Sequence, residues 1–242
     1  MLLAAPGRGC DGKLRLVTVD NRGGLATVSS DVNPNKIALL DSYLVPGRAV
    51  ELGCGSGQYG EAIGRRCDEL LQIDLVDRRA PAARAFPFAA MDAARVGTLG
   101  RRFENVVALD ILEHMPDEDA FVAALAEVCT RRLMLSVPNA DDSQPAIMGL
   151  THFHHTDKTH QREYSPESLE ALLARHGFRV IELRPQFNTL WAFNAPMALA
   201  KKNRLSWLAA KSIWAQCRLY EKIGLFENRC VADWLCAAER IG

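Results

Sequence analysis

Histidine and acidic side chains in the middle of the chain are the best suited to chemistry. His114 ends the run from Asp110 to His114, and a second group of histidines follows further on. Histidine titrates near neutral pH and can take a proton from a hydroxyl group. His114 and His160 are our candidate catalytic residues, although a histidine that only bonds to backbone at a helix start explains His114 equally well. The second group is His152, His154, His155 and His160, of which we expect at least one to be structural.

The same run of residues offers metal ligands. Asp110, Glu113 and His114 place ligand-type side chains on one helical turn, and a loop histidine could complete the shell of a divalent ion. We assign no metal to this chain and keep the metal site as an alternative.

Three alternating glycines follow a short apolar run. Ala49 to Leu52 leads directly into Gly53-Cys54-Gly55-Ser56-Gly57, which predicts a buried strand, a tight loop and the start of a helix. Glycine permits positive φ and lets a ligand approach bare backbone, while the N–H groups at a helix start attract electronegative groups. The loop therefore predicts a ligand site.

Gly55 to Gly60 also matches the dinucleotide-binding pattern G-x-G-x-x-G. That pattern requires an acidic residue about 20 positions further on, at the end of the next strand. Asp74 ends the next apolar run, 14 residues after Gly60 but 21 residues after Gly53. The spacing from Gly53 fits better, so a nicotinamide dehydrogenase is the weakest interpretation.

Acidic residues stand at or beside the ends of four predicted strands. They are Glu51, Asp74, Asp92 and Asp110. Ligands of open α/β sheets bind beyond the carboxyl ends of the strands, so these residues are placed to contact one ligand. Each alone has a structural explanation; Asp92 could cap the helix that follows it.

The elements that position these residues alternate between strands and helices. This order is typical of βαβ units and a parallel sheet, so the predicted fold class is α/β. We expect strands at 48–52, 70–74, 86–91, 105–110, 132–137, 179–183 and 231–238, and an edge strand within 13–20. We expect helices at 34–44, 58–66, 93–99, 117–130 and 166–176.

Together these motifs resemble the class I S-adenosylmethionine-dependent methyltransferases. The run from Glu51 to Gly57 resembles the first motif of that family. Leu112-Glu113-His114, Val137-Pro138-Asn139 and the segment from Asp157 to Phe178 resemble a subgroup that acts on small molecules, quinone precursors and sugars.

The resemblance implies both a fold and a cofactor. The fold is a seven-stranded, mostly parallel Rossmann-like sheet with helices on both faces and an antiparallel seventh strand between strands five and six. The cofactor is S-adenosylmethionine, with its methionyl group near the glycine loop and Asp110, its ribose at Asp74 and its adenine at Asp92. The implied cofactor-binding residues are Glu51, Gly53, Cys54, Gly55, Gly57, Asp74, Met91, Asp92, Ala93 and Asp110.

Composition limits the class of protein. The chain has 242 residues, 48% of them hydrophobic, and 29 basic and 29 acidic side chains. This length suits one domain over 1–242, with an N-terminal extension at 1–32 and a helical insertion or cap at 186–228. Zero net charge argues against a nucleic-acid partner. The N-terminus lacks the charged region of a signal peptide, and no apolar run is long enough to span a membrane. Seven cysteines without a C-x-x-C pair predict reduced thiols. We therefore expect a cytoplasmic protein.

The insertion contains an amphipathic helix at 204–223. Trp207 and Trp214 stand among basic residues, opposite the apolar face. We expect a cap helix buried on both sides, whose tryptophans line the acceptor pocket or a homodimer contact. The alternative is an interfacial helix that touches anionic lipid at the membrane surface. The apolar face carries Leu205, Leu208, Ala209, Ile213, Leu219, Tyr220 and Ile223.

The subgroup resemblance and the aromatic insertion lead us to expect an O-methyltransferase that acts on a sugar hydroxyl in glycan biosynthesis. The acceptor would be a small molecule or a glycan. A small aromatic or quinone-like metabolite is the alternative acceptor. A cofactor-binding protein without turnover is a third interpretation, which detectable methyl transfer would exclude.

Overall fold

The computed structural model describes residues 2–3, 17–18, 32–141, 157–189, 204–223 and 229–241. The chain divides into two compact units. The larger unit comprises Val28–Ala140, Thr159–Gln186 and Asp233–Gly242, and the smaller one comprises Met1–Thr27, Asp141–Lys158 and Phe187–Ala232. The strand-end residues identified from the sequence all belong to the larger unit. A single domain over 1–242 stays a prediction.

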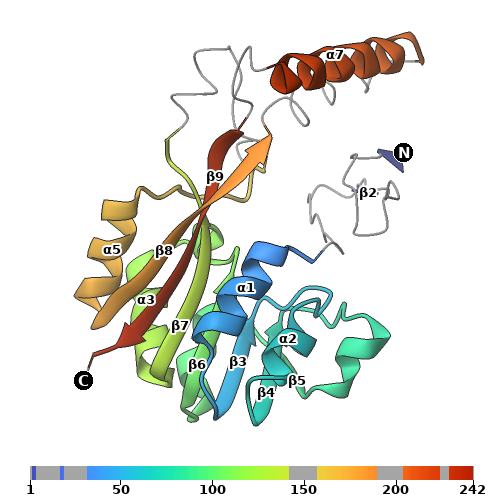
Figure 1. Cartoon of the computed structure of the whole chain (residues 1–242). Coiled ribbons are helices and arrows are strands. Elements are labelled where there is room, and N and C mark those ends of the chain that lie inside the picture. Colours follow the sequence, from blue (N-terminus) through green and yellow to red (C-terminus); the bar gives the residue numbers. More distant parts are fainter. Residues whose placement is uncertain are drawn as a thin grey trace. The chain divides into compact units, whose positions relative to one another are not determined.

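A seven-stranded sheet forms the centre of the larger unit, in the order β5-β4-β3-β6-β7-β9-β8. β3 pairs in parallel with β4 and β6, β4 with β5, and β6 with β7, whereas β9 is antiparallel to β7. The predicted sheet is therefore confirmed, including the last strand between β7 and β8 (Figure 1). The strands are β3 (Arg48–Leu52), β4 (Glu69–Asp74), β5 (Phe88–Ala90), β6 (Phe103–Leu109), β7 (Cys129–Pro138), β8 (Phe178–Thr189) and β9 (Arg229–Arg240).

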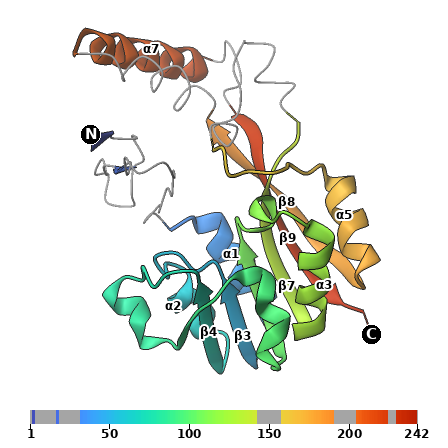
Figure 2. The same ribbon diagram turned by 180° about the vertical axis from the view of Figure 1, so that it is seen from behind.

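Helices cover both faces of the sheet, because successive residues of each strand point to opposite sides. Val106 and Val107 are neighbours in β6, yet they belong to two different apolar cores. The core around Val107 includes residues of α1 (Pro34–Tyr43) and α2 (Gly60–Gly64), which cover the face turned to the viewer in Figure 1. The core around Val106 includes residues of α3 (Glu118–Val128) and α5 (Pro166–Arg175), and Figure 2 shows α3 on that opposite face.

Polar caps fix where these helices begin. Asn33 and Asp117 accept hydrogen bonds from backbone N–H groups in the first turns of α1 and α3. Ser165 and Ser168 bond reciprocally to each other's backbone and form a capping box at α5. These caps satisfy N–H groups that have no partner within the helix, so the element starts are encoded locally.

Several elements differ in length from the prediction. β5 is shorter than the expected strand at 86–91, in part because Pro87 has no N–H to donate. The expected helix at 58–66 is reduced to α2, and the one at 93–99 is a 3-10 helix, η2 (Ala93–Leu99), which ends at Gly100 with a φ of 61°. β8 (Phe178–Thr189) is longer than the expected strand at 179–183, and the insertion at 186–228 stays a prediction. Two further 3-10 helices are η1 (Pro81–Ala85) and η3 (Leu112–His114).

The described part of the smaller unit contains a short ribbon and one helix. β1 (Leu2–Leu3) pairs antiparallel with β2 (Val17–Thr18), and the rest of the expected edge strand at 13–20 lies outside the described residues. The predicted helix in the insertion is confirmed as α7 (Arg204–Lys222). None of the helices that the structure describes is long and apolar enough to cross a membrane.

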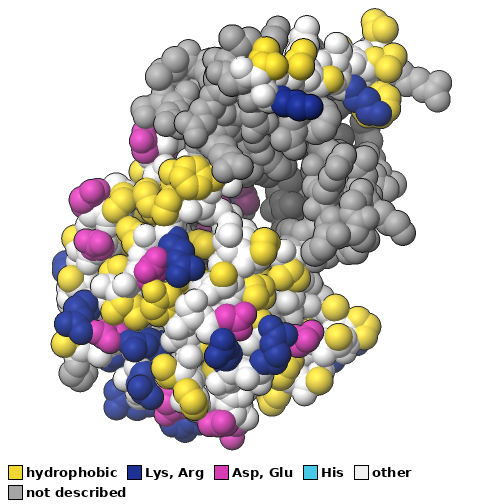
Figure 3. All heavy atoms as spheres, viewed as in Figure 1, with side chains coloured by type: hydrophobic (Ala, Val, Ile, Leu, Met, Phe, Trp, Pro, Cys, Tyr) yellow, Lys and Arg dark blue, Asp and Glu magenta, His cyan; other side chains and the backbone are white. Residues whose placement is uncertain are grey.

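The described surface and cysteines agree with the composition. In Figure 3, basic and acidic side chains lie interspersed over the visible face of the larger unit, as expected for 29 charges of each sign. The four cysteines whose side chains are described, Cys54, Cys67, Cys129 and Cys236, are free thiols.

Candidate functional site

The glycine loop after β3 is held closely at two of its glycines and is open at the third. Gly53, Gly55 and Gly57 have φ values of 64°, 55° and 73°, which side chains other than glycine rarely adopt. A β-carbon at Gly53 would lie 1.9 Å from Ile111 Cδ1, and one at Gly57 would lie 2.4 Å from Ala83 Cβ. A β-carbon at Gly55 would meet nothing within 4 Å. The loop thus leaves space beside the bare backbone of Gly55, which is the fit that a cofactor lying against this backbone requires.

Asp74 ends β4 beside this loop. Its Oδ2 accepts a hydrogen bond from the Gly55 N–H at 2.8 Å, and its Oδ1 accepts one from the Leu75 N–H at 2.7 Å. Cys54 connects the loop to β4 through its own N–H, which donates to the Ile73 carbonyl at 3.0 Å. Its thiol is buried, and burial raises its pKa to about 12. The structure therefore brings the predicted loop and the predicted ribose-binding acid together, with Cys54 contributing backbone.

Glu51 lies inside the sheet, where it is 3% exposed. Its Oε2 accepts a hydrogen bond from Gln72 Nε2 at 2.7 Å, and Gln72 Oε1 in turn accepts one from Arg79 Nη1 at 3.0 Å. Burial raises the pKa of Glu51 to about 7, with a smaller contribution from the nearby Asp74, while the bond from Gln72 opposes the rise. The structure thus gives Glu51 an internal partner, and its contact with a cofactor stays a prediction.

The residues predicted to meet adenine follow β5. Asp92 Oδ1 accepts a hydrogen bond from the Ala94 N–H at 2.9 Å and caps η2, which confirms the structural explanation of this acid. Met91 is half-buried and Ala93 is buried. The Met91 N–H donates to the Asp74 carbonyl at 2.9 Å, so the predicted adenine and ribose positions lie on adjacent strands. Their contact with adenine stays a prediction.

Asp110 follows β6 in an unusual backbone conformation. Its φ of 55° makes it the one non-glycine residue with positive φ among those the structure describes. Ser136 holds it in place: the Asp110 N–H donates to Ser136 Oγ at 3.0 Å, and that hydroxyl donates to Asp110 Oδ1 at 2.6 Å. The other carboxylate oxygen forms an ion pair with the buried ammonium of Lys36. Positive φ at a non-glycine residue is a feature of functional sites, because the surrounding structure must compensate the strain.

Sequence reasoning missed the partners of Asp110. Lys36 stands in α1, 74 positions before Asp110, and nothing in its local pattern marks it as a site residue. Half-buried Asp233 in β9 and buried Glu113 in η3, which the sequence marked only as a possible metal ligand, lie near the same ion pair. Burial, followed by the charge of Asp110, raises the pKa of Glu113 and raises that of Asp233 to about 7, while Lys36 lowers both. The only available signal was the unusual occurrence of a lysine and an acid within otherwise apolar segments.

The two predicted catalytic histidines lie against each other. The rings of His114 and His160 are 4.7 Å apart, at an angle of 75°. His114 Nδ1 lies 3.0 Å from Thr159 Oγ1 and 3.3 Å from the Thr159 carbonyl oxygen. The Gln161 N–H donates to the Glu113 carbonyl at 2.8 Å and fastens this segment to η3. Three further histidines of the sequence group, His152, His154 and His155, lie outside the described residues.

Glu113, His114 and His160 could hold a divalent ion. One ligand atom of each residue lies within 4.8 Å of the others, and two imidazoles with one carboxylate form a donor set that suits transition metals and zinc. Glu113 is buried, and its Oε2 has no hydrogen-bond partner among the described residues. The arrangement thus permits two kinds of chemistry, proton transfer by histidine and coordination of a metal ion.

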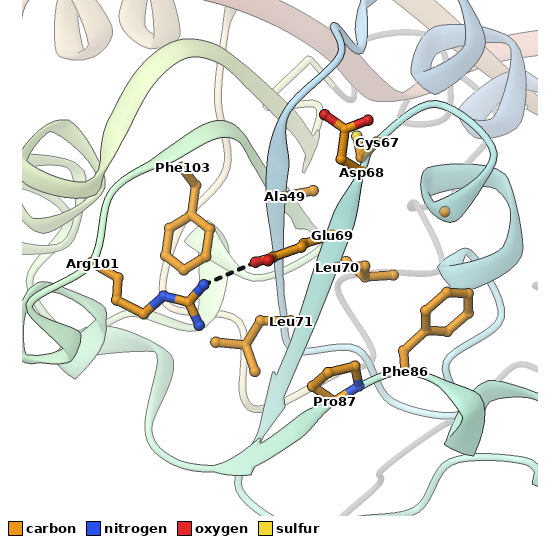
Figure 4. Close-up of a pocket in the computed structure, with 11 residues that line it drawn as sticks. Ala49, Cys67, Asp68, Glu69, Leu70, Leu71, Phe86, Pro87, Arg101 and Phe103 are labelled. Atoms are coloured by element: carbon orange, nitrogen blue, oxygen red, sulfur yellow. Dashed lines mark hydrogen bonds and ion pairs between the residues drawn. The ribbon is translucent and has the colours of Figure 1, made fainter.

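A pocket of about 490 Å³ lies at the opposite edge of the sheet, beside the first residues of β3, β4 and β6 (Figure 4). Arg101 closes one side by an ion pair with Glu69 at 3.0 Å, and Phe86, Leu71 and Phe103 supply apolar walls. Ligands of open α/β sheets bind at the carboxyl ends of the strands, so we assign this pocket no part in the site.

Comparison with known proteins agrees with this arrangement. The sequence profile of the family described as "Methyltransferase domain" matches residues 11–183. A ubiquinone biosynthesis O-methyltransferase of Brucella anthropi is 26% identical over 151 residues, which are 56% of this chain and 61% of that protein. A mitochondrial ubiquinone biosynthesis O-methyltransferase of Arabidopsis thaliana is 26% identical over 132 residues, 45% of this chain and 39% of that protein. The chain thus spans less than two thirds of the length of each of these relatives.

Solved structures share the fold. The magnesium protoporphyrin IX methyltransferase of Synechocystis, solved with bound S-adenosylmethionine, superposes with a TM-score of 0.51 at 16% identity and covers 86% of this chain and 77% of its own. The N-methyltransferase NodS of Bradyrhizobium japonicum, in complex with S-adenosyl-L-homocysteine, gives 0.52 at 13% identity and covers 86% of each chain. The family match, together with the sheet order and the glycine loop, shows that the chain belongs to the methyltransferase-domain family and has the fold of the class I S-adenosylmethionine-dependent methyltransferases.

Proposed function

We propose that this enzyme methylates a hydroxyl group of a small phenolic or quinone-like metabolite. The observation that carries the proposal is the ring contact between His114 and His160. His114 follows Asp110 closely at the carboxyl edge of the sheet, and the segment of His160 is bonded to η3 there through Gln161. A hydroxyl is a weak nucleophile until it loses its proton, so an O-methyltransferase benefits from a base at this edge.

The residues of this chain have distinct roles in the proposed reaction. S-adenosylmethionine, when bound, supplies an electrophilic methyl group on a sulfonium centre. The backbone of Gly55 and the carboxylate of Asp74 hold and orient the cofactor. His114 accepts the proton of the acceptor hydroxyl at Nε2, in the tautomer whose Nδ1–H donates to Thr159. Alignment of the two reactants supplies the rest of the rate enhancement.

Names of relatives favour a phenolic acceptor over a sugar. The two curated relatives described above, and others at 25–28% identity, are ubiquinone biosynthesis O-methyltransferases. Nothing in these comparisons supports the sugar hydroxyl in glycan biosynthesis that we expected from the sequence. The aromatic or quinone-like acceptor, our alternative at that stage, is therefore the one we propose.

A direct competition of acceptors tests the proposal. Purified chain is incubated with methyl-labelled S-adenosylmethionine and either a catechol carboxylate or a nucleotide-linked hexose, and label is followed into each acceptor. We expect label in the catechol and none in the hexose. Label in the hexose alone would restore the glycan interpretation. Methyl transfer to neither, with intact cofactor binding, would contradict both hydroxyl acceptors.

A further inference from the structure

Helix α7 exposes a stripe of large apolar side chains. Leu205, Leu208, Leu219 and Ile223 are 76%, 58%, 54% and 59% exposed. At 100° per residue these four positions fall within about 60° of one another, so they lie on one face of the helix, in two pairs with the exposed Ser212 and Gln216 between them. The cap helix that we expected, with its tryptophans at the acceptor pocket or a homodimer contact, stays a prediction.

The stripe concentrates the apolar exposure of the molecule. Among the described residues, ten large hydrophobic side chains are exposed; four of them, Trp207 included, belong to α7, and a fifth, Ile223, follows it directly. Scattered single apolar residues are normal on a protein surface, whereas a contiguous apolar patch marks an interaction site. The stripe therefore needs a partner.

Positive charge borders the stripe along one side. Trp207 and Lys211 form a cation–π contact, with Lys211 Nζ 4.2 Å from the ring centroid. Lys222 is also exposed, and at 100° per residue it lies about 20° from Lys211 around the helix. Figure 3 shows hydrophobic and basic side chains together on this helix. In the sequence, residues 201–222 hold six basic residues and one acid, Glu221, although the whole chain has 29 of each sign. The basic residues are Lys201, Lys202, Arg204, Lys211, Arg218 and Lys222.

We propose that α7 lies in the headgroup region of an anionic lipid surface, parallel to the membrane plane. The apolar stripe would enter the acyl boundary, the lysines would meet lipid phosphates, and Trp207 would sit at the interface, where tryptophan is enriched. Charge complementarity disfavours a second copy of the chain as the occupant, because two positively charged helices would face each other across a two-fold axis. The proposal is independent of which acceptor the enzyme methylates.

Vesicle binding by the full chain tests the proposal. Co-sedimentation is measured with vesicles of phosphatidylcholine alone and of phosphatidylcholine mixed with phosphatidylglycerol, at low and at high salt. We expect binding to the anionic vesicles only, weakened by salt. Lys211→Glu with Lys222→Glu should lower the binding constant at least about 20-fold, since each basic residue near such a surface contributes about fivefold.

Two further variants separate lipid contact from general effects. Leu208→Ser with Leu219→Ser should abolish binding through loss of the apolar contact, and Arg95→Glu with Arg131→Glu should retain it, because these exposed arginines change net charge equally but lie outside α7. Thermal melts of all variants check folding. If the double leucine variant fails to fold, the binding measured with the double lysine variant tests the proposal. Absence of binding to anionic vesicles at low salt would overturn the proposal. Equal loss in the arginine control would overturn it as well.

Discussion

Contacts of His114 Nδ1 with Thr159 bear on which ring nitrogen can act as a base. Nδ1 lies 3.0 Å from the Thr159 hydroxyl, which can donate or accept, and 3.3 Å from the Thr159 carbonyl, which can only accept; the proposed base is the tautomer with its proton on Nδ1, donated to Thr159. The basic lone pair is then on Nε2, on the other side of the ring. His160, packed edge-on against this ring, limits how the ring can turn.

Replacement of His114 by Gln should lower kcat far more than cofactor affinity. Loss of a general base typically costs about 10²–10⁴ in rate. Calorimetric titration and a methyl-transfer assay on the same preparation separate the two effects. His176→Gln is the control, since His176 pairs with Asp119 at the end of α5. Unchanged kcat would remove His114 from the mechanism, and activity lost to a chelator and restored by a divalent ion would assign Glu113, His114 and His160 to a metal instead.

Glu51 should make the folded chain less stable as pH rises. Its proton leaves the unfolded chain near pH 4.5 but stays on the folded chain up to about pH 7, so the folded state binds more protons between these values. The free energy of unfolding therefore falls with rising pH across this window, by about 3 kcal/mol at most from this residue. Denaturant unfolding of Glu51→Gln should show a smaller fall, with the remainder from Asp233, whose pKa is also about 7, and from Glu113, whose pKa is raised by burial. The same slope as in the parent chain would show that Glu51 is not protonated in the folded state.

At the scale of elements, alanine substitutions in the glycine loop should separate an effect on cofactor binding from an effect on the stability of the chain. Alanine at Gly55 finds open space and costs about 1 kcal/mol for the positive φ, but its methyl group enters the space left for the cofactor. Alanine at Gly57 meets Ala83 Cβ at 2.4 Å in addition to the same strain, so the loop must shift.

We therefore expect Gly55→Ala to fold with a melting temperature close to that of the parent and to lose cofactor affinity at least tenfold. Gly57→Ala should be the less stable of the two. Thermal melts with and without S-adenosylhomocysteine measure both quantities, because a ligand stabilises only the state that binds it. Full ligand stabilisation in Gly55→Ala would show that the cofactor does not lie against this loop.

Local pattern was sufficient to predict the strands and most helices. Short apolar runs, followed by glycine or an acid, located β3 and β4 within one residue. The starts of α3 and α5 were also predicted within one residue, because the caps at Asp117 and Ser165 are local interactions. Element lengths were less predictable. The end of β8 depends on pairing with β9, which lies far away in the sequence, so no local pattern set it.

The parts of the candidate site that depend on a regular spacing along the sequence were predictable, whereas the contacts between residues far apart in the sequence were not. Gly55 and Asp74 are linked by a spacing that the fold dictates, and the sequence placed them together correctly. Lys36 and Asp233 reach Asp110 only through tertiary packing, so their roles as its partners appear only in three dimensions. The capping role of Asp92 lay within reach of the sequence, since it needs only the next two residues.

For the whole molecule, one class of enzyme accounts for the sheet order, the open glycine and the acids along the carboxyl edge. The antiparallel β9 between β7 and β8 places Asp233 near Asp110 and Lys36. The last strand therefore adds an acidic residue to the same edge of the sheet at which β6 ends. On our proposal, surface attachment is left to α7, which lies outside this sheet.

Calorimetric titration of S-adenosylhomocysteine into the parent chain and into Asp74→Asn tests the central claim most directly. The carboxylate of Asp74 is proposed to accept charge-assisted hydrogen bonds from the ribose, and each such bond contributes about 1.5–3 kcal/mol. We predict binding of one ligand per chain, weakened about tenfold to a hundredfold in Asp74→Asn and unchanged in Asp117→Asn, whose side chain only caps α3. Equal affinity in the parent and Asp74→Asn, or no binding to the parent, would contradict a cofactor site at the carboxyl edge of this sheet.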